Sequence, residues 1–268
     1  MIKMKTNQEK DINSVVDFNK YPLSDSSFIN SCRMNINRDG SLVLPDFLTE
    51  SVVSALIDES IKNQEHAYYC RQEHSVYIMP HDKDFPSDHP RNRLVVSSKG
   101  CITDDQIPND SYLKLLYFSE IFKRFVADVV GEKNLYEYKD KLSSVNIHYA
   151  SEGQKLGWHF DNSSFAVTLL IQQPESGGEF QYVRDFRDTD KEDMNYDGVD
   201  KLLKNQMNYD TLTMNSGTLV LFRGKNSIHR VTPVEGKKTR ILAVLAYNSE
   251  PDISLSETSR MTFYGRLD

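Results

Sequence analysis

The chain has 268 residues, of which 38% are hydrophobic and 26% charged, and its formal net charge at pH 7 is −7. This charge provides no basic surface for nucleic acid or anionic lipid, and no stretch approaches the roughly 18 apolar residues of a transmembrane helix. We therefore expect neither a nucleic-acid partner nor a membrane span. A small-molecule partner, bound by a single domain of residues 1–268, is favoured instead.

Three cysteines, Cys32, Cys70 and Cys101, are widely spaced and form no Cys-x-x-Cys motif. The pattern indicates reduced thiols. The N-terminal sequence MIKMKTNQEKDINS lacks the apolar segment of a signal peptide. Together these features predict a cytoplasmic protein. The sequence leaves the oligomeric state open, with a homodimer as one alternative.

The N-terminal half is predicted to be mainly helical. Residues 1–30 are polar and weakly patterned, which predicts an arm that packs only in part. Residues 42–63 predict a short strand followed by a helix. Residues 70–110 lack clear periodicity and include a loop rich in proline and histidine. Residues 110–131 give the strongest helical pattern, with an apolar stripe that ends at Gly131.

From about residue 142 the pattern changes to short strands separated by turns rich in glycine and asparagine. The expected strands are 143–150, 158–161, 165–172, 178–183, 218–222, 229–234 and 240–247. Helices followed by many short strands predict a mainly β sandwich or small barrel, buttressed by the N-terminal helices. Residues 184–210 interrupt these strands, and their acidic stretch lacks the glycine that a calcium loop needs. We interpret them as a surface insertion or a lid.

One expected strand carries His159 and Asp161, which point to the same face because they are two residues apart. Taken alone, the pair is equally consistent with an exposed hydrogen-bonded pair. A second histidine, His229, begins a later strand after a turn that contains glycine. Two histidines and one carboxylate on facing strands form the facial triad of non-haem Fe(II) oxygenases, which leaves one face of the metal open.

Arg240 opens the strand 240–247, the last strong strand of the chain. A buried arginine is costly unless it meets an anion, and a co-substrate carboxylate offers a bidentate partner. The alternative is a surface ion pair, since Lys237 and Lys238 make the preceding turn highly charged. Alternation places the apolar Leu242 on the same face as Arg240.

His159-x-Asp161, His229 and Arg240 resemble the 2-oxoglutarate- and Fe(II)-dependent dioxygenases. The phrases LGWHFDNSSFAVTLLIQQPESGGEFQYV, GTLVLFRGKNSIHRVTPV and MTFYGR resemble, more narrowly, the bacterial free-amino-acid radical halogenases and their hydroxylase relatives. The resemblance runs from about residue 89 to the C-terminus. It implies a double-stranded β-helix, a cupin-like jelly roll, that binds Fe(II) through the two histidines and the aspartate. It also implies 2-oxoglutarate and O2 as co-substrates, with Arg240 pairing with the distal carboxylate of 2-oxoglutarate.

In the halogenases of that subfamily a small residue replaces the carboxylate of the triad, so that chloride can bind. Asp161 is present here, so the resemblance implies a hydroxylase that releases succinate and CO2. The substrate that it implies is a free basic amino acid such as lysine, ornithine or arginine. A hydroxylase of peptidyl side chains and a non-catalytic cupin-like binding module remain as alternatives.

Five further residues are candidates for the binding site. Asn146 is expected to line the co-substrate pocket, and Asn162 lies where the cavity would open. Asp140 is a candidate partner for a substrate amine. The subfamily uses an N-terminal arginine to bind the substrate carboxylate, and Arg91 and Arg93 in the sequence HPRNR are the candidates. Each has a structural alternative: a turn cap, a strand-end hydrogen bond or an arginine that faces solvent.

Overall fold

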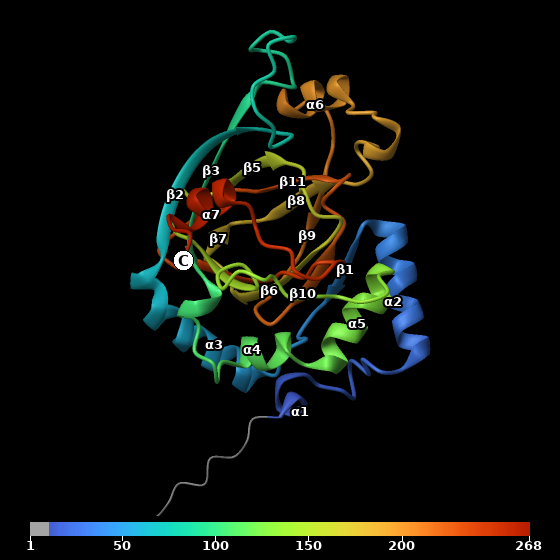
Figure 1. The fold of residues 1–268 in the computed structure, drawn as a ribbon, viewed down its shortest axis with the longest axis vertical. Coiled ribbons are helices and arrows are strands. Elements are labelled where there is room, and N and C mark those ends of the chain that lie inside the picture. Colours follow the sequence, from blue (N-terminus) through green and yellow to red (C-terminus); the bar gives the residue numbers. More distant parts are fainter. Residues whose placement is uncertain (1–10) are drawn as a thin grey trace, which may run out of the picture.

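Residues 11–268 are described by a computed structural model, in which two sheets enclose a cavity (Figure 1). The larger sheet has the order β1 (Ser41–Leu44), β10 (Leu219–Phe222), β6 (Ala166–Gln172), β13 (Arg240–Leu245), β4 (Val145–Ala150), β3 (Leu94–Ile102) and β2 (Tyr68–Ser75). The smaller sheet has the order β5 (Leu156–His159), β11 (Ile228–Val231), β8 (Phe180–Val183) and β9 (Asp210–Leu212). A ribbon pairs β12 (Val234–Glu235) with β7 (Ser176–Gly177). All strand pairs are antiparallel, and the predicted jelly roll is confirmed.

The strands of the larger sheet have two faces with different roles, as β13 shows. Ile241 and Ala243 are fully buried in the main hydrophobic core. Arg240, Leu242 and Val244 alternate with them and line the cavity between the sheets. Because side chains alternate along a strand, one sequence pattern supplies both the core and the binding cavity.

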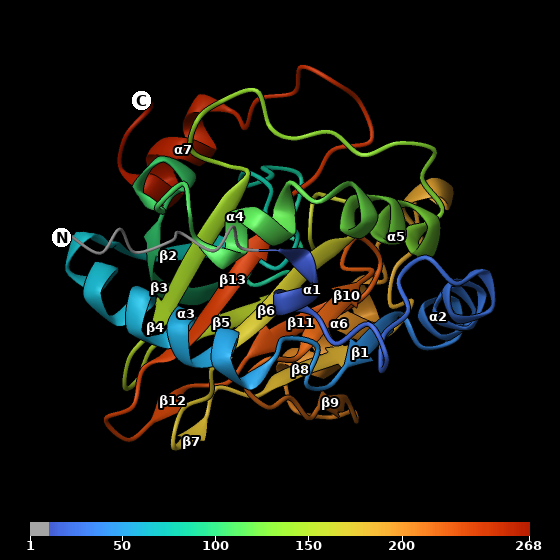
Figure 2. The same ribbon diagram turned by 90° about the horizontal axis from the view of Figure 1, so that it is seen from below.

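Helices cover the face of the larger sheet that points away from the cavity (Figure 2). Their bounds are α1 (Ile12–Val15), α2 (Ser26–Asp39), α3 (Glu50–Asn63), α4 (Tyr112–Tyr117) and α5 (Glu120–Val130). The helices α3 and α4 contact β6 and β4, whereas α2 packs against α5 and β1. Within residues 11–268, no helix is long and apolar enough to cross a membrane.

The N-terminal segment packs against the core through a few apolar side chains within residues 11–30; residues 1–10 of the expected arm lie outside the described residues. Val15, Val16 and Leu23 are at most 1% exposed and belong to the main core. Ile12, Phe18, Phe28 and Ile29 are partly buried against the same core. Most polar residues between them are exposed, so residues 11–30 pack in part.

Two segments, residues 70–110 and 110–131, differ from their predictions. Residues 70–110, which show no periodicity, contain the long hairpin of β2 and β3, which pair over eight residues of β2 from Tyr68 to Ser75. The single helix expected over 110–131 is two helices, because Ser119 caps a new helix by accepting a hydrogen bond from the Phe122 amide. Each of the seven strands predicted after residue 142 corresponds to an observed strand.

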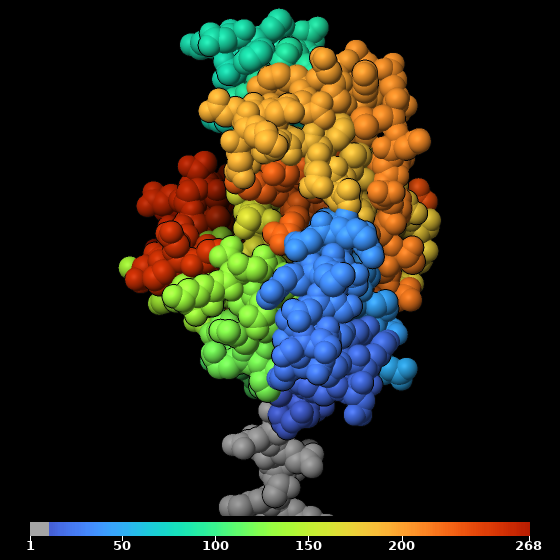
Figure 3. Space-filling model, turned by 90° about the vertical axis from the view of Figure 1, so that its right-hand side faces the viewer, coloured from blue at the N-terminus to red at the C-terminus, as the bar shows by residue number. Residues whose placement is uncertain are grey.

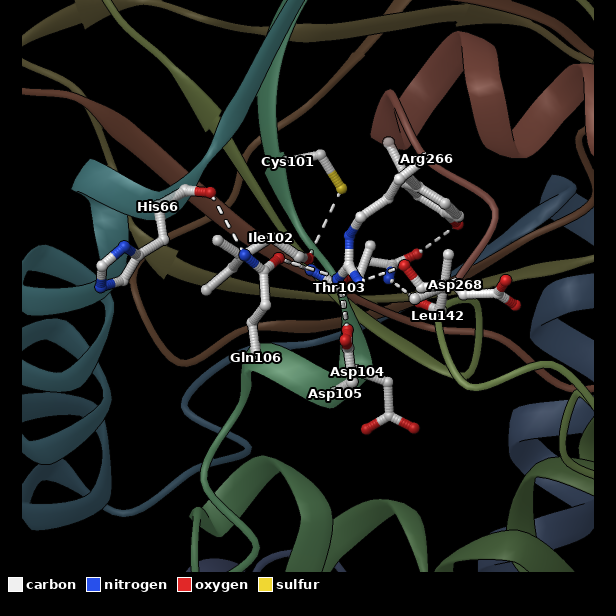
Figure 4. A network of polar contacts seen from close by, with 12 residues as sticks. His66, Cys101, Ile102, Thr103, Asp104, Asp105, Gln106, Leu142, Arg266 and Asp268 are labelled. Atoms are coloured by element: carbon white, nitrogen blue, oxygen red, sulfur yellow. Dashed lines mark hydrogen bonds and ion pairs between the residues drawn. The ribbon is translucent and has the colours of Figure 1, made fainter.

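The C-terminal helix α7 (Glu257–Tyr264) lies against β2 and β3. The segment after it is anchored by Arg266, whose guanidinium donates to Thr103 and Asp105 at 2.6 Å each (Figure 4). On the helix itself, the Tyr264 hydroxyl donates to Oδ1 of Asn146 on β4 at 2.8 Å. These contacts hold the C-terminal helix over one end of the larger sheet.

The insertion, residues 184–210, carries the helix α6 (Tyr196–Leu203). Val199 and Leu202 of α6 are buried in a second hydrophobic cluster with Trp158 and Phe160. Those two aromatic residues alternate with His159 and so face away from the cavity. No residue of 184–210 lines the cavity. The insertion therefore braces the outer face of the smaller sheet in this structure, and the lid interpretation gains no support.

Leu23→Ala tests whether the N-terminal segment packs into the core through Leu23. The side chain is 1% exposed, so its removal from the core is expected to lower the free energy of unfolding by about 2–5 kcal/mol. Urea denaturation measures the change. The control is Met34→Ala on α2, where the side chain is 72% exposed and the expected change is below about 0.5 kcal/mol. Equal, small effects of the two substitutions would show that Leu23 is not packed in the core.

Candidate metal centre

Three predicted ligands meet at one end of the smaller sheet. His159 ends β5, Asp161 follows two residues later, and His229 lies directly opposite His159 in the antiparallel pair of β5 and β11. One ligand atom from each lies within 4.8 Å of the others. The Nε2 atom of His159 is 3.8 Å from Oδ1 of Asp161, and the Nε2 atom of His229 is 3.5 Å from the same oxygen. The predicted triad is therefore brought together by the fold.

Backbone carbonyl groups set the orientation of both imidazole rings. Nδ1 of His159 is 2.8 Å from the Gly157 carbonyl oxygen, and Nδ1 of His229 is 3.1 Å from that of Ser227. A carbonyl oxygen only accepts hydrogen bonds, so each Nδ1 carries a proton, and Nε2 is the nitrogen of each ring that can serve as a ligand atom. Burial, with His229 beside it, lowers the pKa of His159 to about 3. That ring is neutral at pH 7, as a metal ligand must be.

The third ligand, Asp161, is ionised. Burial alone would raise the pKa of this carboxyl, but the neighbouring His229 and His159 outweigh burial and hold it below its usual value. Behind it, the Arg187 guanidinium stacks over the Phe160 ring at 4.1 Å and reaches the Asp161 carbonyl oxygen at 3.5 Å. The insertion thus supports the backbone that carries the carboxylate.

Gly224 makes room for the Asp161 carboxylate. The Asp161 amide donates to the Gly224 carbonyl oxygen at 3.0 Å, which brings the two backbones side by side. A Cβ atom on Gly224 would collide with Oδ2 and Cγ of Asp161. Gly224 was not among the predicted site residues, although a glycine in the turn just before His229 was a visible signal.

The triad opens onto a cavity of about 270 Å³ between the two sheets. Arg240 lines its wall and is 5% exposed, and its guanidinium makes no hydrogen bond or ion pair with any residue of 11–268. Burial lowers the pKa of Arg240 to about 10, so the side chain remains charged at pH 7. A buried cation without a partner calls for an anionic ligand. The apolar floor predicted beside Arg240 is present as Leu242 and Val244.

These residues fit a divalent metal with an anionic co-ligand. Two imidazoles and one carboxylate supply a nitrogen- and oxygen-rich ligand set from one side, and the cavity lies on the other. The unpartnered Arg240 within the same cavity supplies the counter-charge for an anion.

The other candidate residues lie elsewhere. Asn146 is buried and does not line the cavity; its amide nitrogen donates to the carbonyls of Leu142 and Val145. Asp140 accepts from the Leu142 and Leu255 amides and the Ser143 hydroxyl, which makes it a turn cap. Asn162 is exposed and absent from the cavity lining. Asn146 is therefore better described by a hydrogen bond at the end of a strand, and Asp140 by a turn cap, than by a role in binding.

Arg91 and Arg93 lie outside the cavity lining. Arg91 donates to the Pro80 carbonyl oxygen at 3.0 Å, and Arg93 forms an ion pair with Asp200 of α6 at 2.6 Å. Figure 3 shows the loop between β2 and β3 resting on the insertion, at the end of the molecule opposite the N-terminal helices. Arg93 therefore joins the hairpin to the insertion, whereas Arg91 braces the hairpin loop itself, and neither arginine lines the cavity.

Two cavity residues were missed by sequence reasoning: Lys99 on β3 and His148 on β4. Lys99 was hidden because the hairpin that carries it showed no periodicity. His148 lies two residues after Asn146 and so points to the same face of β4. That alternation was the available signal for a second polar residue along this strand.

The fold is that of a class of solved structures. An oxidoreductase of the 2OG-Fe(II) oxygenase family from Burkholderia pseudomallei has a TM-score of 0.53 at 14% identity, with 86% of this chain and 95% of that chain covered. A Pseudomonas putida prolyl-4-hydroxylase has a TM-score of 0.51 at 12% identity, with 81% and 96% covered. HygX from Streptomyces hygroscopicus, solved with nickel, 2-oxoglutarate and hygromycin B, has a TM-score of 0.52 at 14% identity, with 84% and 89% covered.

Residues 24–264 match the family model described as Halogenase D, and the chain belongs to this family. A comparison with curated proteins found no match. The family match spans all three triad residues and Arg240, and it begins within the segment that composition alone had suggested was a loosely packed arm.

Gly224→Ala is expected to weaken metal binding by about 10- to 100-fold, because the added methyl group displaces the Asp161 carboxylate. Calorimetric titration with Co(II) measures the affinity, and circular dichroism checks that the fold is intact. Asp161→Ala should cause a similar loss. The double variant Asp161→Gly with Gly224→Ala should bind no more weakly than Asp161→Gly alone, since the collision is then absent. Wild-type affinity in Gly224→Ala would show that the carboxylate does not need this space.

Proposed function

We propose that the protein is a 2-oxoglutarate- and Fe(II)-dependent hydroxylase of a small free amino acid. The observation that carries the proposal is the joint presence, around one cavity, of the His159, Asp161 and His229 triad and the unpartnered Arg240. Iron bound by the triad would supply the activation of O2. Arg240 would hold the distal carboxylate of 2-oxoglutarate through two parallel hydrogen bonds.

The chain's own residues would keep the reaction controlled. The two backbone carbonyls behind His159 and His229 fix the rings, so that the ligand nitrogens stay aimed at one point. Phe180 and Phe222 pack on the His229 ring with centroids 5.3 and 4.9 Å away, and their apolar surface restricts water beside the ligand. An open face that holds substrate close and excludes bulk water is what selective oxidation requires.

Asp161 favours hydroxylation over halogenation within the Halogenase D family. In a halogenase of the kind that the sequence resembles, a small residue would leave space for chloride at this position. Here the carboxylate fills that space, and Gly224 accommodates it closely. The ligand set is therefore complete without a halide.

The cavity supports a small substrate over a polypeptide. Its volume of about 270 Å³ lies near the lower end of the range for small-molecule sites, about 300–1,000 Å³, and must also hold the co-substrate. The intact triad and Arg240 likewise favour an enzyme over a cupin-like binding module. The free thiols of Cys32, Cys70 and Cys101 agree with the proposed cytoplasmic location.

The resemblance implies a basic amino acid as substrate, and the residues that line the cavity give this choice the least support. Among the described residues that line the cavity, Asp161 is the only acid, and it belongs to the triad. A side-chain ammonium group or guanidinium would therefore find no free carboxylate there.

Turnover tests the class of reaction. Iron-loaded protein with 2-oxoglutarate and O2 is expected to form succinate faster when one free amino acid is added, with a product heavier by one oxygen atom. Asp161→Ala should lose this stimulation because the metal loses a ligand. Mass spectrometry of the product and a succinate assay across the common amino acids and ornithine make the measurement. A chlorinated product would contradict the assignment as a hydroxylase.

Arg240→Met is expected to weaken 2-oxoglutarate binding by at least about 10-fold, because the distal carboxylate would lose a desolvated cationic partner. Calorimetry on metal-loaded protein without O2 measures this affinity separately from turnover. Arg184→Met is the matched control, since Arg184 pairs with Asp185 outside the cavity, and it should leave the affinity unchanged. An unchanged affinity in Arg240→Met would remove the co-substrate assignment.

A further inference from the structure

Lys99 and Arg240 form a pair of cations on one wall of the cavity. The register of β3 with β4 pairs Gly100 with Tyr149, so Lys99 lies level with Ala150, whose partner on β13 is Arg240. The two cationic residues therefore lie two strand spacings apart, about 10 Å between backbones, on either side of a small side chain. Both line the cavity.

The Lys99 ammonium group has neighbours but no anionic partner. Its Nζ is 3.2 Å from both ring nitrogens of His148 and 5.2 Å from the ring centroid of Phe263 on α7. No carboxylate of residues 11–268 lies within ion-pair distance of it. Burial, with Lys99 and Arg240 nearby, lowers the pKa of His148 well below its ordinary value, so this ring is neutral. An enclosed ammonium group without a counter-ion favours an anionic ligand.

The charges of the cavity remain unbalanced after the proposed co-substrate is counted. Lys99, Lys155 and Arg240 supply three cations, and Asp161 supplies one anion. The divalent metal and the dianion 2-oxoglutarate would neutralise each other. An excess of positive charge is then left in the cavity. Arg240 would already be paired with the co-substrate, so Lys99 is the enclosed cation that still lacks an anion.

Lys99 lies toward the metal end of the cavity. The strand β3 that carries it lies beside β5, which ends at His159: the Ser98 amide donates to the Lys155 carbonyl oxygen at 2.7 Å, and the Gly157 amide donates to the Ser97 hydroxyl at 3.0 Å. The other walls near the triad are apolar and include Leu156, Phe180 and Val231. A ligand held at Lys99 would thus extend along an apolar surface beside the open face of the metal.

We infer that Lys99, flanked by His148 and Phe263, is a second anion subsite that binds the carboxylate of the substrate, whose side chain is neutral or acidic rather than basic. The inference rests on the proposed function, and it names the substrate class for that same cavity. A basic side chain would meet Lys155 or the apolar wall instead of a carboxylate. Arg240 remains the partner of the co-substrate.

The C-terminal helix completes this subsite. Phe263 is the residue before Tyr264, whose hydroxyl is bonded to Asn146 at 2.8 Å. Gln72 of β2 also donates to the Thr262 carbonyl oxygen at 3.0 Å. These bonds hold the Phe263 ring against Lys99, so Asn146 acts as a positioning residue for the subsite and does not itself line the cavity.

The experiment compares wild type, Lys99→Met, Lys99→Arg and the control Lys133→Met, which changes an exposed lysine in the turn after α5. Each metal-loaded protein is first titrated with 2-oxoglutarate by calorimetry without O2. The 2-oxoglutarate complex is then titrated with the common amino acids and ornithine, and with L-leucinamide and L-glutamine amide as probes that lack a free carboxylate.

We expect wild type and Lys133→Met to bind at least one amino acid with a neutral or acidic side chain, and to bind the amides at least about 10-fold more weakly. Lys99→Met should lose that amino-acid affinity by a similar factor while its 2-oxoglutarate affinity stays within about 3-fold of wild type. Lys99→Arg should retain most of the binding because it keeps the charge.

Several results would overturn the subsite. One is a parallel loss of 2-oxoglutarate affinity in Lys99→Met, and another is equal affinity of wild type for the amides and the amino acids. A third is the strongest binding for lysine, ornithine or arginine. The last is a wild type that binds 2-oxoglutarate but binds no free amino acid. Failure of wild type to bind 2-oxoglutarate at all is a different outcome, because it rejects the proposed function itself.

Discussion

Antiparallel pairing of β5 with β11 places His159 opposite His229, and the rest of the metal centre depends on this register. Because side chains alternate along a strand, a slip of β5 by one residue would turn His159 toward the outer cluster around Trp158. The same register brings Asp161 beside the turn that contains Gly224, where the missing Cβ leaves space for its carboxylate. One pairing thus fixes two ligands directly and the third through a backbone contact.

Packing outside the cavity protects that register. The insertion buries Val199 and Leu202 against Trp158 and Phe160, which are the outward-facing neighbours of the ligands. The hairpin of β2 and β3 is joined to the insertion by the ion pair of Arg93 with Asp200. Segments whose sequences suggested a lid and a substrate clamp thereby serve to hold the smaller sheet in place, and the cavity is left to a few inward-facing residues.

Charge inside the cavity separates the proposed roles of its residues. Asp161 is held ionised by the two histidines, whereas Arg240 and Lys99 carry charge with no carboxylate beside them. Desolvated cations are stabilised only by anions that enter the site, so the enclosed space itself selects for them. Two such cations on either side of Ala150 suit a reaction in which two anionic molecules are bound together.

The sequence by itself determined the strand pattern after residue 142 and the pairing of His159 with Asp161 on one face, because period-two alternation is a local property of a chain; His229 and Arg240 were assigned through the resemblance of their motifs. Only the tertiary structure decided that Arg93 pairs with the insertion, that Asn146 bonds to Tyr264, and that Val15, Val16 and Leu23 reach the core. It also revealed Lys99 and Gly224, whose roles depend on which side chains lie across the cavity or across a turn. Such contacts between distant segments leave no periodic trace in the sequence, since they are set by how the sheets and loops pack.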